Sequence, residues 1–330
     1  MSAPVLILSR RDIAALMTPA DYLAAVEAAF RAEREGRAHA PPPMHIDGDG
    51  GAFHGKAAFL KDSQPLVALK LNGNFPGNPA QGLPTIQGAI LLADAANGVL
   101  LAIMDSIEVT LQRTAAASAL AARYFARADA ETLLICGCGD QAPAQLAALL
   151  GVRQIARALA FDIDRAKAER LAAGARARHG IDIAITQNLG EAALASDIVV
   201  TATTAREPVL FAGDIRPGAF VAAVGADNPE KNEIAPDLMA AARLVCDAKS
   251  QCAVMGDLRA AIATGVMAAE DIHAELGEIV TGEKPARRSP EEIFIFDSTG
   301  TAIEDVATAA VIFERASERG AGRAVALGAL

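Results

Sequence analysis

The 330-residue sequence lacks any uninterrupted run of about 18 apolar residues, the length that a membrane-spanning helix requires. Near its N-terminus it carries Asp12 and Asp21 and has no basic stretch followed by an apolar core, so no secretory signal is expected. The basic residues are dispersed and the net charge is −10, which argues against a nucleic-acid partner. These absences predict a cytoplasmic protein that binds neither membranes nor nucleic acid.

Residues that ligate metals are also scarce. The four cysteines are Cys136, Cys138, Cys246 and Cys252. The first two form a C-x-C pair, but a metal site needs further ligands, and the five histidines are scattered without a metal-binding spacing. The pattern favours reduced cysteines in a cytosolic protein, and no metal is expected.

What the sequence does contain is a strand, a glycine turn and a helix in direct succession. Residues 132–136 form a continuous apolar run of strand length, and Gly137, Gly139 and Ala142 follow in the pattern G-x-G-x-x-A. Backbone N–H groups at the start of such a helix bind a pyrophosphate, which side chains at the two glycines would keep away. The alternative, an α/β glycine turn without a nucleotide, is disfavoured by the repeated strand–helix pattern that follows.

An acidic residue in the next unit favours NAD as the dinucleotide. The strand expected over residues 159–162 ends at Asp162, 25 residues after Gly137, near the spacing at which a carboxylate binds the adenine-side ribose. A carboxylate there repels a 2′-phosphate, although the nearby Arg165 leaves NADP possible. Further parallel strands are expected over residues 196–201 and 219–224.

The first 120 residues show a different pattern. A helix is expected over residues 9–36, with Ser9 as its N-cap and Gly36 closing it. Strand candidates separated by turn signals follow at residues 53–60, 66–71, 87–93 and 99–104. Tight turns between consecutive strands predict an antiparallel or mixed sheet. A helix is expected over residues 108–126, bridging to the second half, and a last strand at 293–296. A helix at 302–315 is expected to return to the first domain. The C-terminal tail after it is expected to be frayed.

Three charged residues suggest chemistry on a small zwitterion. Lys70, at the end of a strand candidate, and Arg113, in the bridging helix, could clamp a carboxylate. Asp227 follows a parallel strand, where loops gather over a cofactor, and could shuttle a proton to or from an amine. Taken singly, each is more often a surface charge.

Together with the glycine turn, these residues lie in blocks that resemble the ornithine cyclodeaminase/mu-crystallin family over nearly the whole chain. The blocks are residues 70–79, 82–85, 104–105, 113–118, 137–142, 224–231 and 296–300. Residues 272–280 and 296–305 look most like the archaeal-type alanine dehydrogenases in that family. The resemblance implies an α/β fold, with a Rossmann NAD-binding domain at residues 119–301. It also implies a mixed-sheet α/β domain for substrate binding and homodimerisation at residues 1–118 with 302–330.

The resemblance also implies roles for individual residues. Lys70 would hold the substrate carboxylate or polarise the reacting bond, and Asp227 would be the general acid/base. The residues implied for substrate binding are Lys70, Arg113 and Thr299. Those implied for the cofactor are Thr85, Arg113, Thr114, Gly137, Gly139, Asp140, Gln141, Asp162, Thr201, Ala202, Thr203, Val224, Gly225, Lys231 and Ser298.

The chain departs from the family pattern at the carboxylate anchor. Many members carry an arginine shortly after the Pro-rich turn, where this chain has Pro43, followed by Met44 and His45, whereas Lys56 stands where methionine is common. We hypothesise that Lys56, with Lys70, replaces the arginine. The alternative is that Lys56 is solvated and another group binds the carboxylate.

The expected activity is hydride transfer between NAD(H) and the α-carbon of a small amino or imino acid. Reduction of a cyclic ketimine such as Δ1-pyrroline-2-carboxylate, or reductive amination of an oxoacid such as pyruvate, fits this chemistry. Two alternatives are ornithine cyclodeamination to proline and ammonia with catalytic NAD+, and a non-catalytic mu-crystallin-like binder. The sequence leaves the substrate and the reaction direction open.

Overall fold

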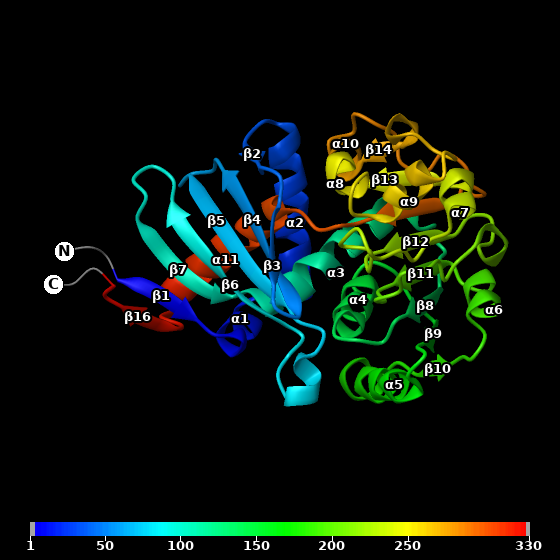
Figure 1. The fold of residues 1–330 in the computed structure, drawn as a ribbon, viewed down its shortest axis with the longest axis horizontal. Coiled ribbons are helices and arrows are strands. Elements are labelled where there is room, and N and C mark those ends of the chain that lie inside the picture. The colour runs from blue at the N-terminus through cyan, green and yellow to red at the C-terminus, as the bar shows by residue number, and fades with distance from the viewer. Residues whose placement is uncertain (1–3, 328–330) are drawn as a thin grey trace. The chain divides into compact units, whose positions relative to one another are not determined.

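The computed structural model describes residues 4–327 and divides the chain into two compact units (Figure 1). Unit 1 consists of the residues up to Arg113 together with those from Thr301 onward, and unit 2 is Thr114–Gly300. The boundary between Arg113 and Thr114 lies inside helix α3 (Ser106–Phe125). The boundary expected between residues 118 and 119 falls in the same helix.

Unit 2 is a parallel α/β sheet of the Rossmann type. Within the described residues its strands lie in the order β10-β9-β8-β11-β12-β15-β13-β14, and every pairing is parallel. The strands are β8 (Thr132–Cys136), β9 (Arg157–Phe161), β10 (Ile183–Ile185), β11 (Ile198–Thr201), β12 (Phe220–Ala223), β13 (Arg243–Cys246), β14 (Ala274–Glu275) and β15 (Phe294–Asp297). The helices are α4 (Gln141–Leu150), α5 (Arg165–His179), α6 (Leu189–Leu194), α7 (Pro236–Ala241), α8 (Lys249–Cys252), α9 (Asp257–Ala263) and α10 (Leu276–Val280), with short 3-10 turns at Ala212–Asp214 and Ala269–Asp271. The central strands are buried throughout, as their unbroken apolar runs predict.

Unit 1 is built on a mixed sheet. Its path of strands, as far as the described residues go, is β16-β1-β7-β6-β5-β4-β2, with β3 paired to β4. The strands are β1 (Val5–Leu8), β2 (Ala38–His39), β3 (Met44–Gly48), β4 (Gly51–Leu60), β5 (Leu66–Asn74), β6 (Ile86–Asp94), β7 (Leu100–Asp105) and β16 (Arg323–Val325). The helices are α1 (Arg10–Leu16), α2 (Pro19–Arg34), the start of α3 and α11 (Ala302–Arg319), with a 3-10 turn at Asn78–Gln81. Only β1 and β7 pair in parallel among these strands, so the expected mixed sheet is confirmed.

The two faces of this sheet differ in what covers them. Helix α11 packs on β4, β5 and β6, and the side chains beneath it, such as Ala58, Ala68 and Ile90, are buried. Because side chains alternate along a strand, their neighbours Leu69 and Leu71 belong to the opposite face, where they are 39% and 43% exposed. The covered face carries the charged residues described below.

The helix expected over residues 9–36 is two helices. Ser9 caps α1 as predicted, but Thr18 caps a second helix at whose first position Pro19 stands, so the chain turns between them. In the described part of the chain, no single helix is long and apolar enough to cross a membrane. The α1–α2 pair, bent by 88°, meets that test by length and composition only.

Two further expectations need correction. Strand β5 continues to Asn74, so Lys70 lies in the interior of the strand and not at its end. The C-terminal tail, expected to be frayed, forms β16, which pairs antiparallel with β1, while residues 328–330 lie outside the described residues.

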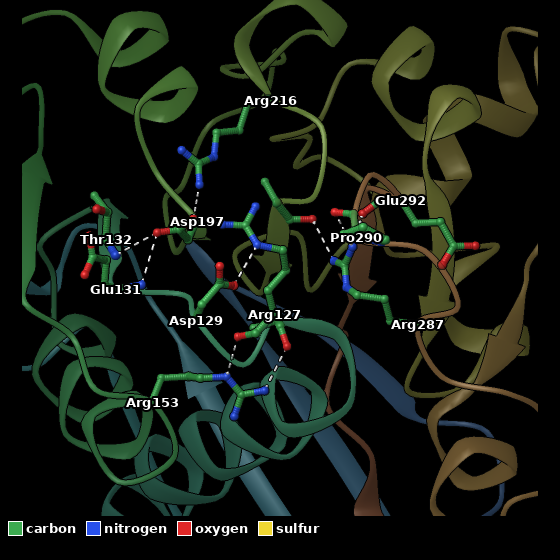
Figure 2. A network of polar contacts seen from close by, with 12 residues as sticks. Arg127, Asp129, Glu131, Thr132, Arg153, Asp197, Arg216, Arg287, Pro290 and Glu292 are labelled. Carbon is green, nitrogen blue, oxygen red and sulfur yellow. Dashed lines mark hydrogen bonds and ion pairs between the residues drawn. The ribbon is translucent and has the colours of Figure 1, made fainter.

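A polar network fixes the amino-terminal ends of strands β8 and β11 in unit 2 (Figure 2). The buried carboxylate of Asp197 accepts hydrogen bonds from the backbone N–H groups of Glu131 (3.1 Å) and Thr132 (3.0 Å). Arg127 Nη2 lies 2.8 Å from Asp197 Oδ1, and Arg216 contacts the same oxygen. Because this network lies at the edge opposite to the glycine turn, it supports the fold and not the site.

Candidate active site

Four charged side chains meet on the covered face of unit 1. Lys70, from β5, is 3% exposed, and its Nζ lies 2.6 Å from Asp305 Oδ2 in the first turn of α11. Arg113, from α3, places Nε 3.1 Å from Asp305 Oδ1 and Nη1 3.4 Å from Glu304 Oε2. The structure therefore brings Lys70 and Arg113 together, as a carboxylate clamp requires, and links them through two acids to which the sequence had given no role.

Burial and charge shift the pKa values of this cluster in opposite ways. Burial lowers the pKa of the Lys70 ammonium to about 7, although the Asp305 carboxylate opposes that shift. Burial raises the pKa of Asp305, but the charges of Lys70 and Arg113 outweigh it and leave the pKa below its ordinary value. At neutral pH Asp305 is thus ionised, whereas Lys70 is poised between its charged and neutral forms.

Lys56 lies directly beside this cluster. In the antiparallel pairing of β4 and β5 it is the partner of Lys70, so both side chains belong to the same face. In the pairing of β3 and β4, Met44 is opposite Gly55, and Pro43 comes just before Met44 whereas Lys56 comes just after Gly55. The position of the missing arginine and that of the additional lysine therefore both adjoin the same strand pair.

The glycine turn of unit 2 has the geometry that a pyrophosphate needs. Gly137 has φ +91°, and a Cβ there would lie 2.6 Å from the carbonyl oxygen of Ala202. At Gly139 a Cβ would meet no atom within 4 Å, so the space above the turn is open. The Cys138 N–H donates to Asp162 Oδ2 (2.7 Å) and thereby fixes the acid at the end of β9 against the turn.

Two further features of this region fit a dinucleotide. A cavity of about 250 Å³ adjoins Asp162, and Ile163 on its rim is 97% exposed. The lining residues are Phe161, Asp162, Ile163, Arg165, Ile185, Thr186 and Gln187. At the start of α4, the buried Gln141 Oε1 has no hydrogen-bond partner among the described residues. Sequence reasoning missed the apolar rim because an exposed isoleucine has no motif of its own.

The loops that follow β11 and β12 are joined by a buried glutamate that sequence reasoning also missed. Glu233 accepts hydrogen bonds from Thr201 Oγ1 (2.8 Å), Thr203 N (2.6 Å) and Gly225 N (2.8 Å). Burial raises the pKa of Glu233 to about 7. Three of the predicted cofactor residues are thus held together by one carboxylate.

The other predicted residues of unit 2 lie after β12 and β15. Asp227 is 48% exposed, and its Oδ1 lies 2.7 Å from Nζ of Lys231. Ser298 and Thr299 donate to the buried Asp247 at 3.0 and 3.3 Å. These contacts occupy hydroxyl groups that the sequence had assigned to cofactor and substrate.

Five further predicted cofactor residues are located by the fold without a side-chain contact that defines a role among the described residues. Thr85 belongs to unit 1, and its carbonyl accepts from Phe75 N (2.8 Å). The others, in unit 2, are Thr114 in α3, Asp140 before α4, Ala202 after β11 and Val224 after β12. Their assignment remains a prediction from the resemblance.

Two of the cysteines lie close to a buried carboxylate. Donor atoms of Cys246, Cys252 and Asp297 lie within 4.8 Å of one another, and all three residues are buried. Burial raises the pKa of Cys252 well above its ordinary value, and its thiol donates to Asp247 Oδ1 (3.3 Å).

The chain combines a Rossmann unit that has an open glycine turn with a mixed-sheet unit that has a buried lysine. These features define a two-unit α/β protein of the dinucleotide-binding class. The profile of the ornithine cyclodeaminase/mu-crystallin family matches residues 5–320. The chain belongs to this family, as its sequence blocks predicted.

Three kinds of relative are similar over almost the whole chain. Alanine dehydrogenase of Archaeoglobus fulgidus is 36% identical over 96% of this chain and 97% of its own. The structure of an archaeal alanine dehydrogenase dimer with bound NAD has a TM-score of 0.93, with 36% identity over 98% of this chain and 99% of that chain. Δ1-pyrroline-2-carboxylate reductase of Thermococcus litoralis, solved with NADH and L-proline, has a TM-score of 0.94 and 37% identity over 97% and 99%. Iminosuccinate reductase of Paracoccus denitrificans is 30% identical over 97% and 99%, and its structure with NAD+ has a TM-score of 0.91, with 29% identity over 98% and 100% of the two chains.

Proposed function

We propose that the protein is an NAD-dependent oxidoreductase that transfers a hydride at the α-carbon of a small amino or imino acid. The observation that carries this proposal is the buried cluster of Lys70, Arg113 and Asp305, a charged site for a small zwitterion in a family of nicotinamide enzymes. The named relatives act on alanine, pyrroline-2-carboxylate or iminosuccinate, and all these reactions interconvert a C–N single bond and a C=N bond beside a carboxylate.

The residues of unit 2 fit NAD(H). The open space at Gly139, the unpartnered Gln141 Oε1 and the cavity beside Asp162 are what a pyrophosphate and an adenosine require. Asp162 favours NAD because a 2′-phosphate would meet its negative charge. When bound, the nicotinamide would supply or accept the hydride, while Asp227, the half-exposed acid after β12, would exchange a proton with the substrate nitrogen.

The residues of unit 1 would hold the substrate. Lys70 and Arg113 both contact Asp305, and Lys56 is opposite Lys70 across β4 and β5, so three cationic side chains gather at this place. They would attract a substrate carboxylate, and Lys56 would take the part of the arginine that many family members carry. Because a bound anion favours the charged form of Lys70, substrate binding would also raise the pKa of that lysine.

An NADH-oxidation screen tests the proposal. The purified protein is given Δ1-pyrroline-2-carboxylate, or pyruvate with ammonia, and in parallel ornithine with NAD+. Loss of absorbance at the nicotinamide band with an imine or an oxoacid supports a reductase. Proline and ammonia formed from ornithine with catalytic NAD+ would identify a cyclodeaminase, and NADH binding without any turnover would identify a mu-crystallin-like binder.

Lys56→Met tests the anchor separately. We expect the KM for the substrate to rise at least about tenfold while the affinity for NADH is unchanged, since a charge-assisted hydrogen bond contributes about 1.5–3 kcal/mol. An unchanged KM would show that another group binds the carboxylate.

We also propose that the protein is a homodimer through the open face of the unit 1 sheet. This face exposes Met44, Ile46, Phe53, Leu69, Leu71 and Leu91 by 37% to 48%. Contiguous apolar side chains of this extent are typical of a protein–protein interface, and the solved archaeal relative is a dimer. Sedimentation should give the mass of two chains, and Leu71→Asp should shift the population toward monomer, whereas a monomeric wild-type protein would contradict the proposal.

A further inference from the structure

The carboxylate of Asp305 lies between the two cations of the substrate site. Its Oδ2 is 2.6 Å from Lys70 Nζ and its Oδ1 is 3.1 Å from Arg113 Nε, so each oxygen faces a different cation. All three residues are buried, and water therefore screens these ion pairs little. An ammonium group has three N–H donors, so the ion pair with Asp305 leaves Lys70 donors for a substrate.

The first turn of α11 keeps this carboxylate in place. Glu304, the residue before Asp305, caps the helix by accepting from the backbone N–H (2.9 Å) and the hydroxyl (3.0 Å) of Thr301. The other oxygen of Glu304 lies 3.4 Å from Arg113 Nη1, and the helix packs on β4, β5 and β6. Asp305 therefore cannot leave Lys70 without disturbing a capped and packed helix end.

Asp305 also opposes the other influences on the charge of Lys70. Burial lowers the pKa of the Lys70 ammonium, and the charges of Arg113 and Lys56 lower it further, whereas the Asp305 carboxylate raises it. Removing the Asp305 charge would leave only the influences that favour the neutral amine.

The remaining neighbours of Lys70 contribute no negative charge. Its strand partner on β6 is the apolar Ile90, and the Thr110 hydroxyl on α3, 3.5 Å from Nζ, is a neutral acceptor. On β4, His54 is two residues before Lys56, so it belongs to the same face of the sheet.

We propose that Asp305 is a positioning residue of the reaction, which holds Lys70 in place and in its charged form. The ammonium can then bind the substrate carboxylate or stabilise negative charge at the reacting carbon. The inference rests on the proposed function and adds to it a residue that acts through Lys70 and does not touch the substrate itself.

Asp305→Asn tests the proposal, because it keeps the shape of the side chain and removes its charge. The first measurement is an NMR titration of isotope-labelled lysine Cε groups in the free protein, which needs no substrate. The chain has seven lysines, and the Lys70 signal is the one missing from the spectrum of Lys70→Arg. We expect the titration midpoint of Lys70 to fall by at least about one pH unit, a tenfold weaker hold on its proton.

The second measurement is the pH profile of kcat/KM, with the substrate that the NADH-oxidation screen identifies. The falling limb should move to lower pH by the same amount. Relative to wild type, Asp305→Asn should then lose about tenfold in kcat/KM near pH 8 and stay within about threefold near pH 6. A purely structural role would lower kcat/KM by the same factor at both pH values.

Two further variants separate charge from stability. Asp21→Asn is the matched control, because Asp21 Oδ1 also pairs with a cation of α11, Arg315, at 2.7 Å. It should lower the Tm and leave the Lys70 midpoint unchanged. Asp305→Glu keeps the charge on a side chain one CH2 longer, so the midpoint should stay within about half a pH unit of wild type. Its kcat/KM should fall at every pH, because the carboxylate is displaced.

The inference is overturned if Asp305→Asn folds and its Lys70 titrates at the wild-type midpoint. It is also overturned if the midpoint moves but kcat/KM falls equally at both pH values, since the reaction then does not use the charge of Lys70. If Asp305→Asn does not fold, Asp305→Glu decides: a retained midpoint supports the inference, and one lowered by a full pH unit overturns it. If no imine or oxoacid oxidises NADH, the proposed function fails, whereas the NMR titration still shows whether Asp305 holds the charge on Lys70.

Discussion

The two glycines of the dinucleotide turn should fail in different ways when each is changed to alanine. Gly137 has φ +91°, and its Cβ would lie 2.6 Å from the carbonyl oxygen and 2.7 Å from the carbonyl carbon of Ala202. Gly139 is not at positive φ, and its Cβ would meet no atom within 4 Å. One substitution therefore strains the folded chain, whereas the other changes only the space above the turn.

The magnitude for Gly137→Ala follows from two terms. A left-handed backbone costs a residue with a Cβ about 1–2 kcal/mol, and a forced backbone shift in a packed region costs about 1–3 kcal/mol. Together these lower the free energy of unfolding by about 2–5 kcal/mol, equivalent to a fall in Tm of roughly 4–20 °C for a domain of this size. Gly139→Ala lacks both terms, so its Tm should stay within about 2 °C of wild type.

Thermal denaturation without cofactor and fluorescence titration with NADH separate the two effects. Gly139→Ala should keep the stability and weaken NADH binding at least about tenfold, because the methyl group occupies the approach of the pyrophosphate. If Gly139→Ala binds NADH as tightly as wild type, the dinucleotide does not lie against this turn. If Gly137→Ala unfolds at the wild-type temperature, the backbone argument is wrong.

Three other predictions concern single charged residues. Burial lowers the pKa of Lys70 to about 7, so the ammonium loses its charge as the pH rises through that value. We therefore expect kcat/KM for reduction to fall above about pH 7. A flat profile between about pH 6 and 9 would contradict this. Asp197→Ala should lower the free energy of unfolding by about 3 kcal/mol in urea titrations and leave KM unchanged, since it strips the network in Figure 2 of its acceptor. Asp162→Ser should raise the NADPH/NADH ratio of kcat/KM at least about tenfold by removing the charge that a 2′-phosphate would meet; an unchanged ratio would exclude Asp162 from cofactor choice.

Local sequence patterns were sufficient to predict the central strands of the Rossmann unit. The apolar run at residues 132–136 coincides with β8, and the strands expected near residues 198, 220 and 294 exist with boundaries shifted by one or two residues. Parallel strands buried on both faces are continuous apolar runs, so their signal does not depend on the rest of the fold. The break between α1 and α2 was also encoded locally, by Thr18 and Pro19, but the surrounding apolar periodicity concealed it.

The contacts of the site were less predictable because they join distant parts of the chain. Arg113 and Asp305 are 192 positions apart, and no spacing rule connects a lysine inside β5 to the first turn of α11. Whether Pro43 lies close to Lys56 depends on the register in which β3 pairs with β4. The sequence does not determine that register until the hairpin is known. The motif blocks could therefore suggest the residues, whereas their partners required the fold.

The buried carboxylates of unit 2 clarify which acid is suited to proton transfer. Glu233 joins the loops after β11 and β12, and Asp247 holds the loop after β15, in part through a 2.6 Å hydrogen bond from Gly300 N. Asp297 accepts the N–H groups at the start of α9, and burial raises its pKa well above the ordinary value. Each of these acids is enclosed and occupied by donors, so a proton exchanged with a substrate could not reach it without breaking the loops. Asp227, at 48% exposure and paired only with neighbouring side chains, is free of that constraint, and this favours it over the three buried acids as the general acid/base.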